Sequence, residues 1–170
     1  MGAGVISKIH LGVPVVDADG KLVIYAEAHA ALTAYTPYAV VPSVNTEDDL
    51  HAFKTGGGLP GDADADDGKA VTKVPATLVV PHWIGVPQEA YASGKVAKLQ
   101  IGGAGKCLLN GDFTSNVYVE VINAGTYGIP AGAAQTTEAF AYCCQQDTAI
   151  STTTATNVQF LSVPVLVAGS

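Results

Sequence analysis

The feature that most constrains the fold is a series of short apolar runs over residues 77–122, separated by turn-forming residues. Within residues 95–101, Ala97, Leu99 and Ile101 fall on one face of an extended chain, and polar residues fall on the other. Val117, Val119 and Val121 alternate in the same way with Tyr118 and Glu120. Such alternation is typical of a β-strand with one buried face. The pattern predicts strands over Thr77–Pro81, His82–Glu89, Lys95–Ile101, Lys106–Leu109 and Asn116–Ile122, with turns at Ser93-Gly94, Gly102-Gly103, Gly105 and Asn110-Gly111.

Before this stretch, a hairpin is expected from Ile9–Val16 and Lys21–Tyr25, closed by residues 17–20 (Asp-Ala-Asp-Gly), which suit a tight turn. Thr46–Lys54 predicts a short helix, because Thr46 can cap its start. A long loop over residues 55–73 follows. After the meander, we expect a loop over Asn123–Gln135, a Thr-rich connection over Thr148–Thr156, and final strands over Thr137–Gln145 and Asn157–Val167.

The chain also contains an internal repeat. The run Ile84-Gly85-Val86 aligns with Phe140-Ala141-Tyr142, and Lys95–Ile101 aligns with Asn157–Val163. This alignment predicts that Leu99, Ile101, Leu161 and Val163 all point into a core. Two related hairpins without intervening helices suggest a small barrel or sandwich. We therefore expect a mainly β protein with a barrel-like domain over residues 77–170 and an N-terminal extension over residues 1–76 that carries the hairpin and the short helix.

Composition and charge exclude several partners. The 170 residues carry a net charge of −7 and eight Lys, with no Arg. Because Arg and clustered basic residues grip phosphates and bases, no nucleic-acid partner is expected. No apolar run approaches the ~20 residues of a membrane-spanning helix, and the N-terminus does not resemble a signal peptide. The sequence therefore predicts a protein made in a cytoplasm, with no membrane partner.

One acidic segment resembles a cation-binding loop. Asp62, Asp64 and Asp66 stand at the alternate positions that calcium loops use, followed by Asp67. However, the glycine comes one position late, and Lys73 replaces the glutamate that would complete the site. A solvated acidic loop is the preferred interpretation, and a weak metal site is left open.

No catalytic, cofactor-binding or metal-binding residue is assigned, and the chain is not expected to be an enzyme. The segment Gly102–Lys106 is not a phosphate-binding loop, because Cys107 replaces the Ser or Thr that would bind magnesium. A Cys–His dyad assembled in three dimensions is left open for Cys107. The four histidines lack zinc-site spacing. The three cysteines show no disulfide framework and are expected to be reduced and mostly buried. The residues concerned are His10, His29, His51, His82, Cys107, Cys143 and Cys144.

The repeat resembles a known family. The runs Trp83–Ala90, Ser93-Gly94, Lys95–Ile101 and Gly105–Leu109 are similar to the small capsid decoration, or cement, proteins of tailed bacteriophages, which share a Gly-Val/Ile strand, a glycine turn and a Val-x-Val strand. The similarity covers residues 78–167. It implies a trimeric structural protein of the virion, which is made in the host cytoplasm, binds the major capsid protein on the outer capsid surface and stabilises contacts between its subunits. It implies no catalytic residues.

A second hypothesis remains open beside this one. A β-sandwich could instead be a binding module for a glycan or a host-surface ligand, since aromatic rings stack on sugars. Exposed aromatic residues in a monomer would favour this hypothesis, whereas buried aromatic residues in a trimer would favour the capsid clamp. The candidate stacking residues are Trp83, Tyr91, Tyr118, Tyr127 and Tyr142.

Overall fold

The computed structural model describes residues 12–28, 30–42, 53–55, 83–121, 126–144, 146 and 148–165. Their regular secondary structure consists entirely of β-strands. The predicted mainly β fold is therefore confirmed. Within these residues, no helix is long and apolar enough to cross a membrane.

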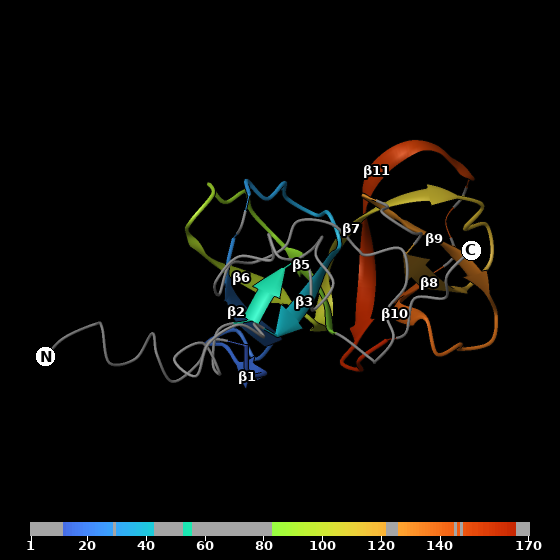
Figure 1. Ribbon diagram of the computed structural model, residues 1–170. Coiled ribbons are helices and arrows are strands. Elements are labelled where there is room, and N and C mark those ends of the chain that lie inside the picture. Colours follow the sequence, from blue (N-terminus) through green and yellow to red (C-terminus); the bar gives the residue numbers. More distant parts are fainter. Residues whose placement is uncertain are drawn as a thin grey trace, which may run out of the picture.

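The N-terminal part forms one curled sheet, which we call the first sheet (Figure 1). Its strand order is β1-β2-β4-β3-β5-β6, and β6 also pairs with β2, so the pairings run full circle. Its core is apolar and includes Ile24, Leu32, Tyr38 and Leu99. The strands are β1 (Val15–Val16), β2 (Leu22–Glu27), β3 (Tyr38–Pro42), β4 (Phe53–Thr55), β5 (Trp83–Pro87) and β6 (Val96–Gln100).

The C-terminal part is a closed barrel with the order β10-β11-β7-β9-β8. In β8, Val117, Val119 and Val121 are buried in its core, whereas Tyr118 and Glu120 between them are half-buried. This is the alternation that the sequence predicted. The strands are β7 (Gly102–Gly111), β8 (Val117–Val121), β9 (Gly128–Gly132), β10 (Ala139–Cys143) and β11 (Ile150–Leu161).

The first sheet and the barrel share one topology. Strands β2 to β6, taken in chain order, correspond to β7 to β11: both rings run first-third-second-fourth-fifth and return to the first strand. The directions also agree. The first and third strands pair in parallel in each ring. The other pairs in each ring are antiparallel. The chain is therefore a tandem of two like units, of which the sequence repeat revealed only the last two strands.

The strand register corrects part of that repeat. Val86 pairs with Gln100, and Tyr142 pairs with Gln159, so Gln100 and Gln159 are equivalent. It follows that Ala97, Leu99 and Ile101 correspond to Thr156, Val158 and Phe160, and all six are buried. The predicted burial of Leu99 and Ile101 is confirmed. The prediction is wrong for Leu161, which is half-buried, and for Val163, which is 36% exposed.

The reason for this error is an odd offset in the alignment, because a shift by an odd number of residues moves a side chain to the other face of a strand. The sequence alignment placed Leu161 and Val163 three positions too far along the strand. The next residue after β11, Ser162, has a left-handed backbone (φ 58°), which ends the alternation of faces. Its N–H donates to the carbonyl of Ile101 at 3.0 Å, so this segment crosses back to the start of the barrel.

The two units pack closely against each other. Ala39, Ile84 and Val86 point outward from β3 and β5 of the first sheet, yet they belong to the apolar cluster that fills the barrel. The opposite face of β5 lines the first core, where a Cβ on Gly85 would lie 2.7 Å from Leu99 Cβ. Strand β5 is therefore buried on both faces and belongs to both cores.

Within the residues described, strand β9 pairs with β7 only at Leu109, and groups from the first sheet cover the part of that edge before Leu109. The Gln100 amide Nε2 donates to the carbonyls of Gly102 (3.0 Å) and Ala104 (2.9 Å). The Gln88 amide accepts from Lys106 N (2.9 Å) and donates to Lys106 O (3.0 Å), as a paired strand would. The N–H of Leu108 donates to the carbonyl of Tyr35 at 2.8 Å. An edge that could pair with another chain is thus covered within the molecule.

Several sequence-based boundaries are corrected by these pairings. The division between residues 76 and 77 does not separate the units, because β5 and β6 pair with β3 and β2. The break lies between Gln100 and Gly102, where β6 ends and β7 begins. The predicted turns Gly102-Gly103, Gly105 and Asn110-Gly111 lie inside β7, whose ladder with β11 is continuous from Gly102 to Leu109 and reaches Gly111 after a register shift.

Three further segments differ from expectation. Phe53–Thr55 forms β4, so the predicted helix cannot reach Lys54, and its remaining residues lie outside those described. The predicted loop 123–135 contains β9, and the Thr-rich connection 148–156 is largely the start of β11. Thr77–Pro81 also lies outside the described residues. The hairpin is confirmed for its described part, with Asp17 Oδ1 accepting from the N–H groups of Asp19 and Lys21 at 2.9 Å.

Candidate functional site

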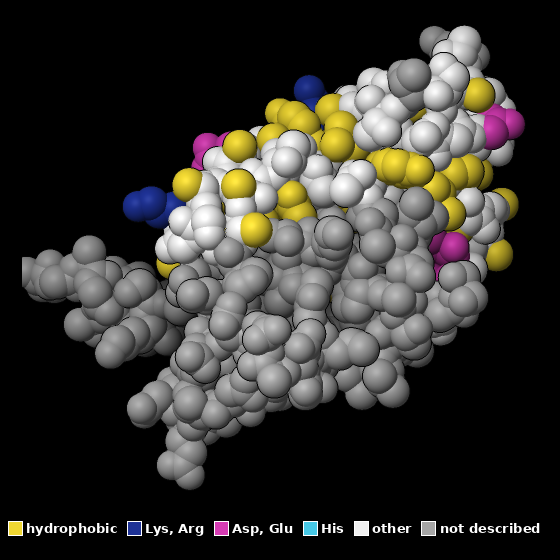
Figure 2. Space-filling model, turned by 45° about the horizontal axis from the view of Figure 1, so that its top comes forward, with side chains coloured by type: hydrophobic (Ala, Val, Ile, Leu, Met, Phe, Trp, Pro, Cys, Tyr) yellow, Lys and Arg dark blue, Asp and Glu magenta, His cyan; other side chains and the backbone are white. Residues whose placement is uncertain are grey.

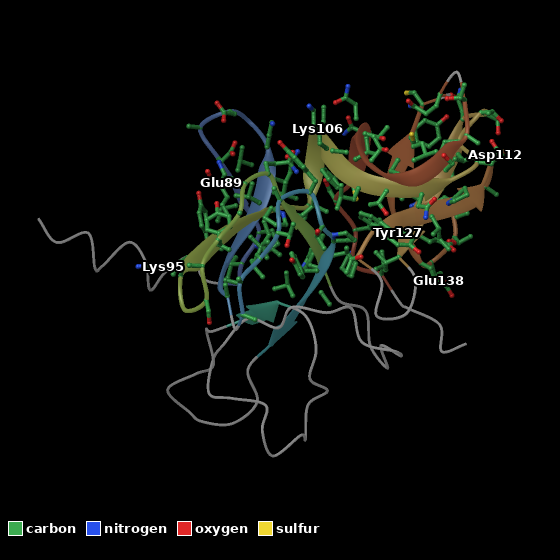
Figure 3. All side chains as sticks on the ribbon, turned by 90° about the horizontal axis from the view of Figure 1, so that it is seen from above. Glu89, Lys95, Lys106, Asp112, Tyr127 and Glu138 are labelled. Carbon is green, nitrogen blue, oxygen red and sulfur yellow. The ribbon has the colours of Figure 1, made fainter. Side chains whose placement is uncertain are left out.

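The described charged side chains do not gather into a reactive cluster. Figure 3 shows Glu89 and Lys95 on the first sheet, far from Asp112 and Glu138 on the barrel, with Lys106 where the two units meet. No group of three or more His, Cys, Asp or Glu among the described residues is placed to hold a metal ion. The four histidines and the acidic segment 62–67 lie outside the described residues, so the cation-site question stays open.

The cysteines are free, as expected, but their burial differs. Cys107 and Cys143 are fully buried in the barrel core, and burial raises the pKa of both thiols. A thiol with a raised pKa is a poor nucleophile at neutral pH. Cys144 is exposed, which corrects the expectation that all three would be mostly buried. It follows Cys143 at the end of β10, so the two neighbours face apart.

The candidate stacking residues do not form one platform. Trp83 and Tyr91 pack against the core of the first sheet, whereas Tyr118 and Tyr142 lie on the barrel. Tyr127 is half-buried just before β9. The rings of Tyr118 and Tyr142 meet edge to face, with centroids 5.1 Å apart and planes at 67°. Two rings at this angle do not present a continuous flat surface to a sugar.

The outer side of β8 and β10 carries the first of two candidate interaction surfaces, which we call the tyrosine face and define as Tyr118, Glu120 and Tyr142. All three side chains are half-buried on the outside of the barrel. Tyr118 and Tyr142 are directly opposite each other in the strand pair. The hydroxyl of Thr136 donates to the carboxylate of Glu120 and holds it in place beside them. The face is aromatic, with one fixed acceptor.

The second candidate surface lies at the other end of the molecule, on the segment that covers the edge of β2. We call it the valine edge and define it as Val13 and Val16. Their side chains are 47% and 68% exposed, among the most exposed large apolar groups described. The segment is held by the pairing of Val16 with Leu22 and by the bond from Gly12 N to Tyr25 O at 2.7 Å.

Electrostatics around the valine edge are local. Asp17 accepts from Lys98 Nζ at 3.1 Å, and its side chain is only 5% exposed. The N–H of Lys21, helped by Lys98, lowers the pKa of the Asp17 carboxyl, and Asp17 in turn raises the pKa of Lys98. This ion pair fixes the β1–β2 turn onto β6 and satisfies both charges.

The barrel half is poor in charge. After residue 101 the sequence has Lys106 and four acidic residues, Asp112, Glu120, Glu138 and Asp147. Figure 2 shows apolar and uncharged polar side chains over the described surface of one face, with few and separated charges. Depletion of charge together with tyrosine is typical of surfaces that bind other proteins.

Comparison of the chain with protein-family models, curated proteins and solved structures finds no match.

Proposed function

We propose that this chain is a structural protein of a tailed-phage virion, which binds the outer surface of the head and ties neighbouring major capsid subunits together. The observation that carries the proposal is the rigid junction of two like β units. A clamp between neighbouring subunits needs two contact surfaces held at a fixed separation. Here the shared strand β5 and the amides of Gln88 and Gln100 supply that rigidity.

The surface chemistry supports the same proposal. A low density of charge and the half-buried tyrosines on the outside of the barrel suit contact with protein. The family resemblance also supports the proposal. The residues that carry the resemblance are buried, so they support a shared fold more directly than a shared binding surface; they include Ile84, Val86, Leu99 and Leu109. A homotrimer would match the local symmetry of a closed shell.

The experiment is binding to capsids. Heads of the phage that carries this sequence, purified without the protein, should bind it saturably in co-sedimentation. The loaded heads should rupture at a higher temperature than bare heads, because a ligand that binds only the intact shell stabilises it. No binding, or binding without a shift in rupture temperature, would refute the clamp function.

The glycan-binding hypothesis makes the opposite prediction. It expects a monomer whose exposed tyrosines bind sugars, and the same protein can be tested on a glycan array. The edge-to-face arrangement of Tyr118 and Tyr142 gives this hypothesis less support than the clamp.

A further inference from the structure

The junction between the two units has a donor side and an acceptor side. The donor side is the outer face of β3 and β5 of the first sheet, where Ala39, Ile84 and Val86 are 0%, 3% and 0% exposed. The acceptor side is the barrel at the edge of β7, where Lys106 and Leu108 bond to groups from the first sheet. The units therefore follow each other head to tail, and Figure 1 shows them side by side in that order.

The barrel carries its own copy of the donor side, and that copy is the tyrosine face. In the shared topology, β3 and β5 correspond to β8 and β10. Tyr142 is equivalent to Val86, because the sequence repeat aligns the two residues and each pairs with a glutamine of the following strand. Val119 pairs with Ala141, and Tyr38 pairs with the equivalent residue Gly85. The residues that follow them, Glu120 and Ala39, are therefore equivalent. Two of the donor positions, those of Ala39 and Val86, are thus half-buried in the barrel, whereas the third, that of Ile84, is taken by Phe140, which is buried in the barrel core.

The first sheet likewise carries its own copy of the acceptor side, and that copy is the valine edge. Strand β2 corresponds to β7, and Tyr25 is equivalent to Lys106 by register. The Tyr25 carbonyl accepts a hydrogen bond from the N–H of Gly12, just as the equivalent Lys106 carbonyl accepts one from the side-chain amide of Gln88. The covering segment presents Val13 and Val16 outward. Each end of the tandem therefore carries aromatic or aliphatic side chains at the position where the other unit would continue the series.

We propose that a second copy of this chain binds there, with the tyrosine face of one molecule against the valine edge of the next. The contact would continue the internal junction between molecules. Because the two surfaces differ, the association is heterologous, and it forms a ring if the rotation closes and a filament if it does not. The contact does not require a capsid, so it can be tested on the purified protein alone.

The test uses the full chain and three exposed or half-exposed positions. Val16→Lys disables the valine edge, and Tyr142→Lys disables the tyrosine face. Lysine is chosen because the chain carries a charge of −7, so the change adds no general repulsion. Val96→Lys is the matched control, because Val96 is 47% exposed but lies away from the valine edge. Val96 pairs with Glu27 at the end of β2, on the β6 side, whereas Val16 pairs with Leu22 at the start of β2, on the β1 side. Circular dichroism confirms that each variant is folded, and Tyr118→Lys replaces Tyr142→Lys if the latter is not.

Light scattering then measures the oligomeric state. The wild type and Val96→Lys should self-associate, whereas Val16→Lys and Tyr142→Lys should each do so about 10-fold more weakly or not at all. A mixture of the two disabled variants should form a 1:1 dimer, because each retains the surface that the other lacks. A wild type that stays monomeric at every concentration overturns the proposal. A mixture of the two disabled variants that forms no mixed dimer also overturns it. Loss of self-association in Tyr142→Lys but not in Val16→Lys overturns it as well, because that result would indicate two tyrosine faces packed on each other.

Discussion

The first sheet and the barrel reach the same topology with different strand lengths. Strands β2 and β6 have six and five residues, whereas their equivalents β7 and β11 have ten and twelve. In the first sheet, β1 covers the edge of the first strand, β2. In the barrel, the equivalent edge of β7 is covered by three residues of the preceding unit, Gln88, Gln100 and Tyr35. Strand order is thus common to both units, while the way each unit closes its edge depends on what precedes it in the chain.

The two cores also place their large and small residues at different positions of equivalent strands. Ile24 in β2 is equivalent to Gly105 in β7, and Ile101 is equivalent to Phe160. A Cβ on Gly105 would lie 2.7 Å from the ring of Phe160, so the larger side chain in one strand requires the smaller residue in the next. A constant total volume with different residues is the form in which cores tolerate substitution best.

The most severe test of the comparison replaces equivalent core residues, Leu99 and Val158, by aspartate. Each change removes a well-packed side chain and buries an unpaired carboxylate, at a combined cost of about 5 kcal/mol or more, comparable to the whole stability of many domains. Because β5 belongs to both cores, we expect either variant to unfold the whole protein. Circular dichroism and tyrosine fluorescence would check this. Retention of one folded unit would contradict the shared core.

A smaller effect is expected at Gly85 and its equivalent, Ala141. Gly85→Ala would place a Cβ 2.7 Å from Leu99 Cβ, and a backbone-fixed atom cannot move aside. We expect a loss of about 1–3 kcal/mol in the free energy of unfolding. Ala141→Gly, the reverse change, should cost only about 0.5–1 kcal/mol. Denaturant unfolding of both variants measures the difference, and equal losses would show that the two units pack alike at this position.

The junction itself is tested with Gln88→Ala. Loss of the bonds to Lys106 N and O should lower stability by about 0.5–1.5 kcal/mol and speed hydrogen exchange of the Lys106 amide. Gln159→Ala is the control, because Gln159 is exposed on the outside of β11. Exchange in the centre of β8 should not change. If Gln159→Ala speeds hydrogen exchange of the Lys106 amide as much as Gln88→Ala does, the hydrogen bonds from the Gln88 side chain have no specific role.

The smallest effect is expected from acid. Asp17 in the first sheet and Asp112 in the barrel both have a lowered pKa, the first chiefly through the N–H of Lys21 and the second through the hydroxyl and N–H of Thr114. A carboxyl whose pKa is lower in the folded state stabilises it above the unfolded value of about 3.9, and this contribution is lost as the pH falls through the folded pKa. Asp17→Asn and Asp112→Asn should each flatten the decline of melting temperature below that pH. An unchanged slope in either variant would exclude that residue as a contributor.

The sequence predicted the local features well. Alternation in residues 95–101 and 117–121 identified β6 and β8, and Asp17 with Gly20 identified the first turn. These signals are local, because each depends on side chains two residues apart or on a turn of four residues. The repeat at β5–β6 and β10–β11 was visible for the same reason.

What the sequence did not predict depends on distant contacts. Glycines inside β7 indicated turns, because nothing local shows that Phe160 and Gln100 occupy the space beside Gly105. The pairing of β5 with β3 crosses the loop that separated the predicted domains. The tyrosine face and the valine edge were missed as a pair. The repeat aligned Tyr142 with Val86, but only the structure shows that Val86 packs against the barrel, and no motif marks Val16.

The double burial of β5 also sets the order of events during synthesis. All strands of the first sheet emerge from the ribosome before any strand of the barrel has emerged. At that stage Ala39, Ile84 and Val86 form an apolar face with nothing to cover it, since their partners lie in residues made later. A nascent chain with such a face is prone to misassembly. A pause in translation that leaves residue 101 just outside the ribosome should therefore increase aggregation of the newborn protein, and release of the finished chain should not.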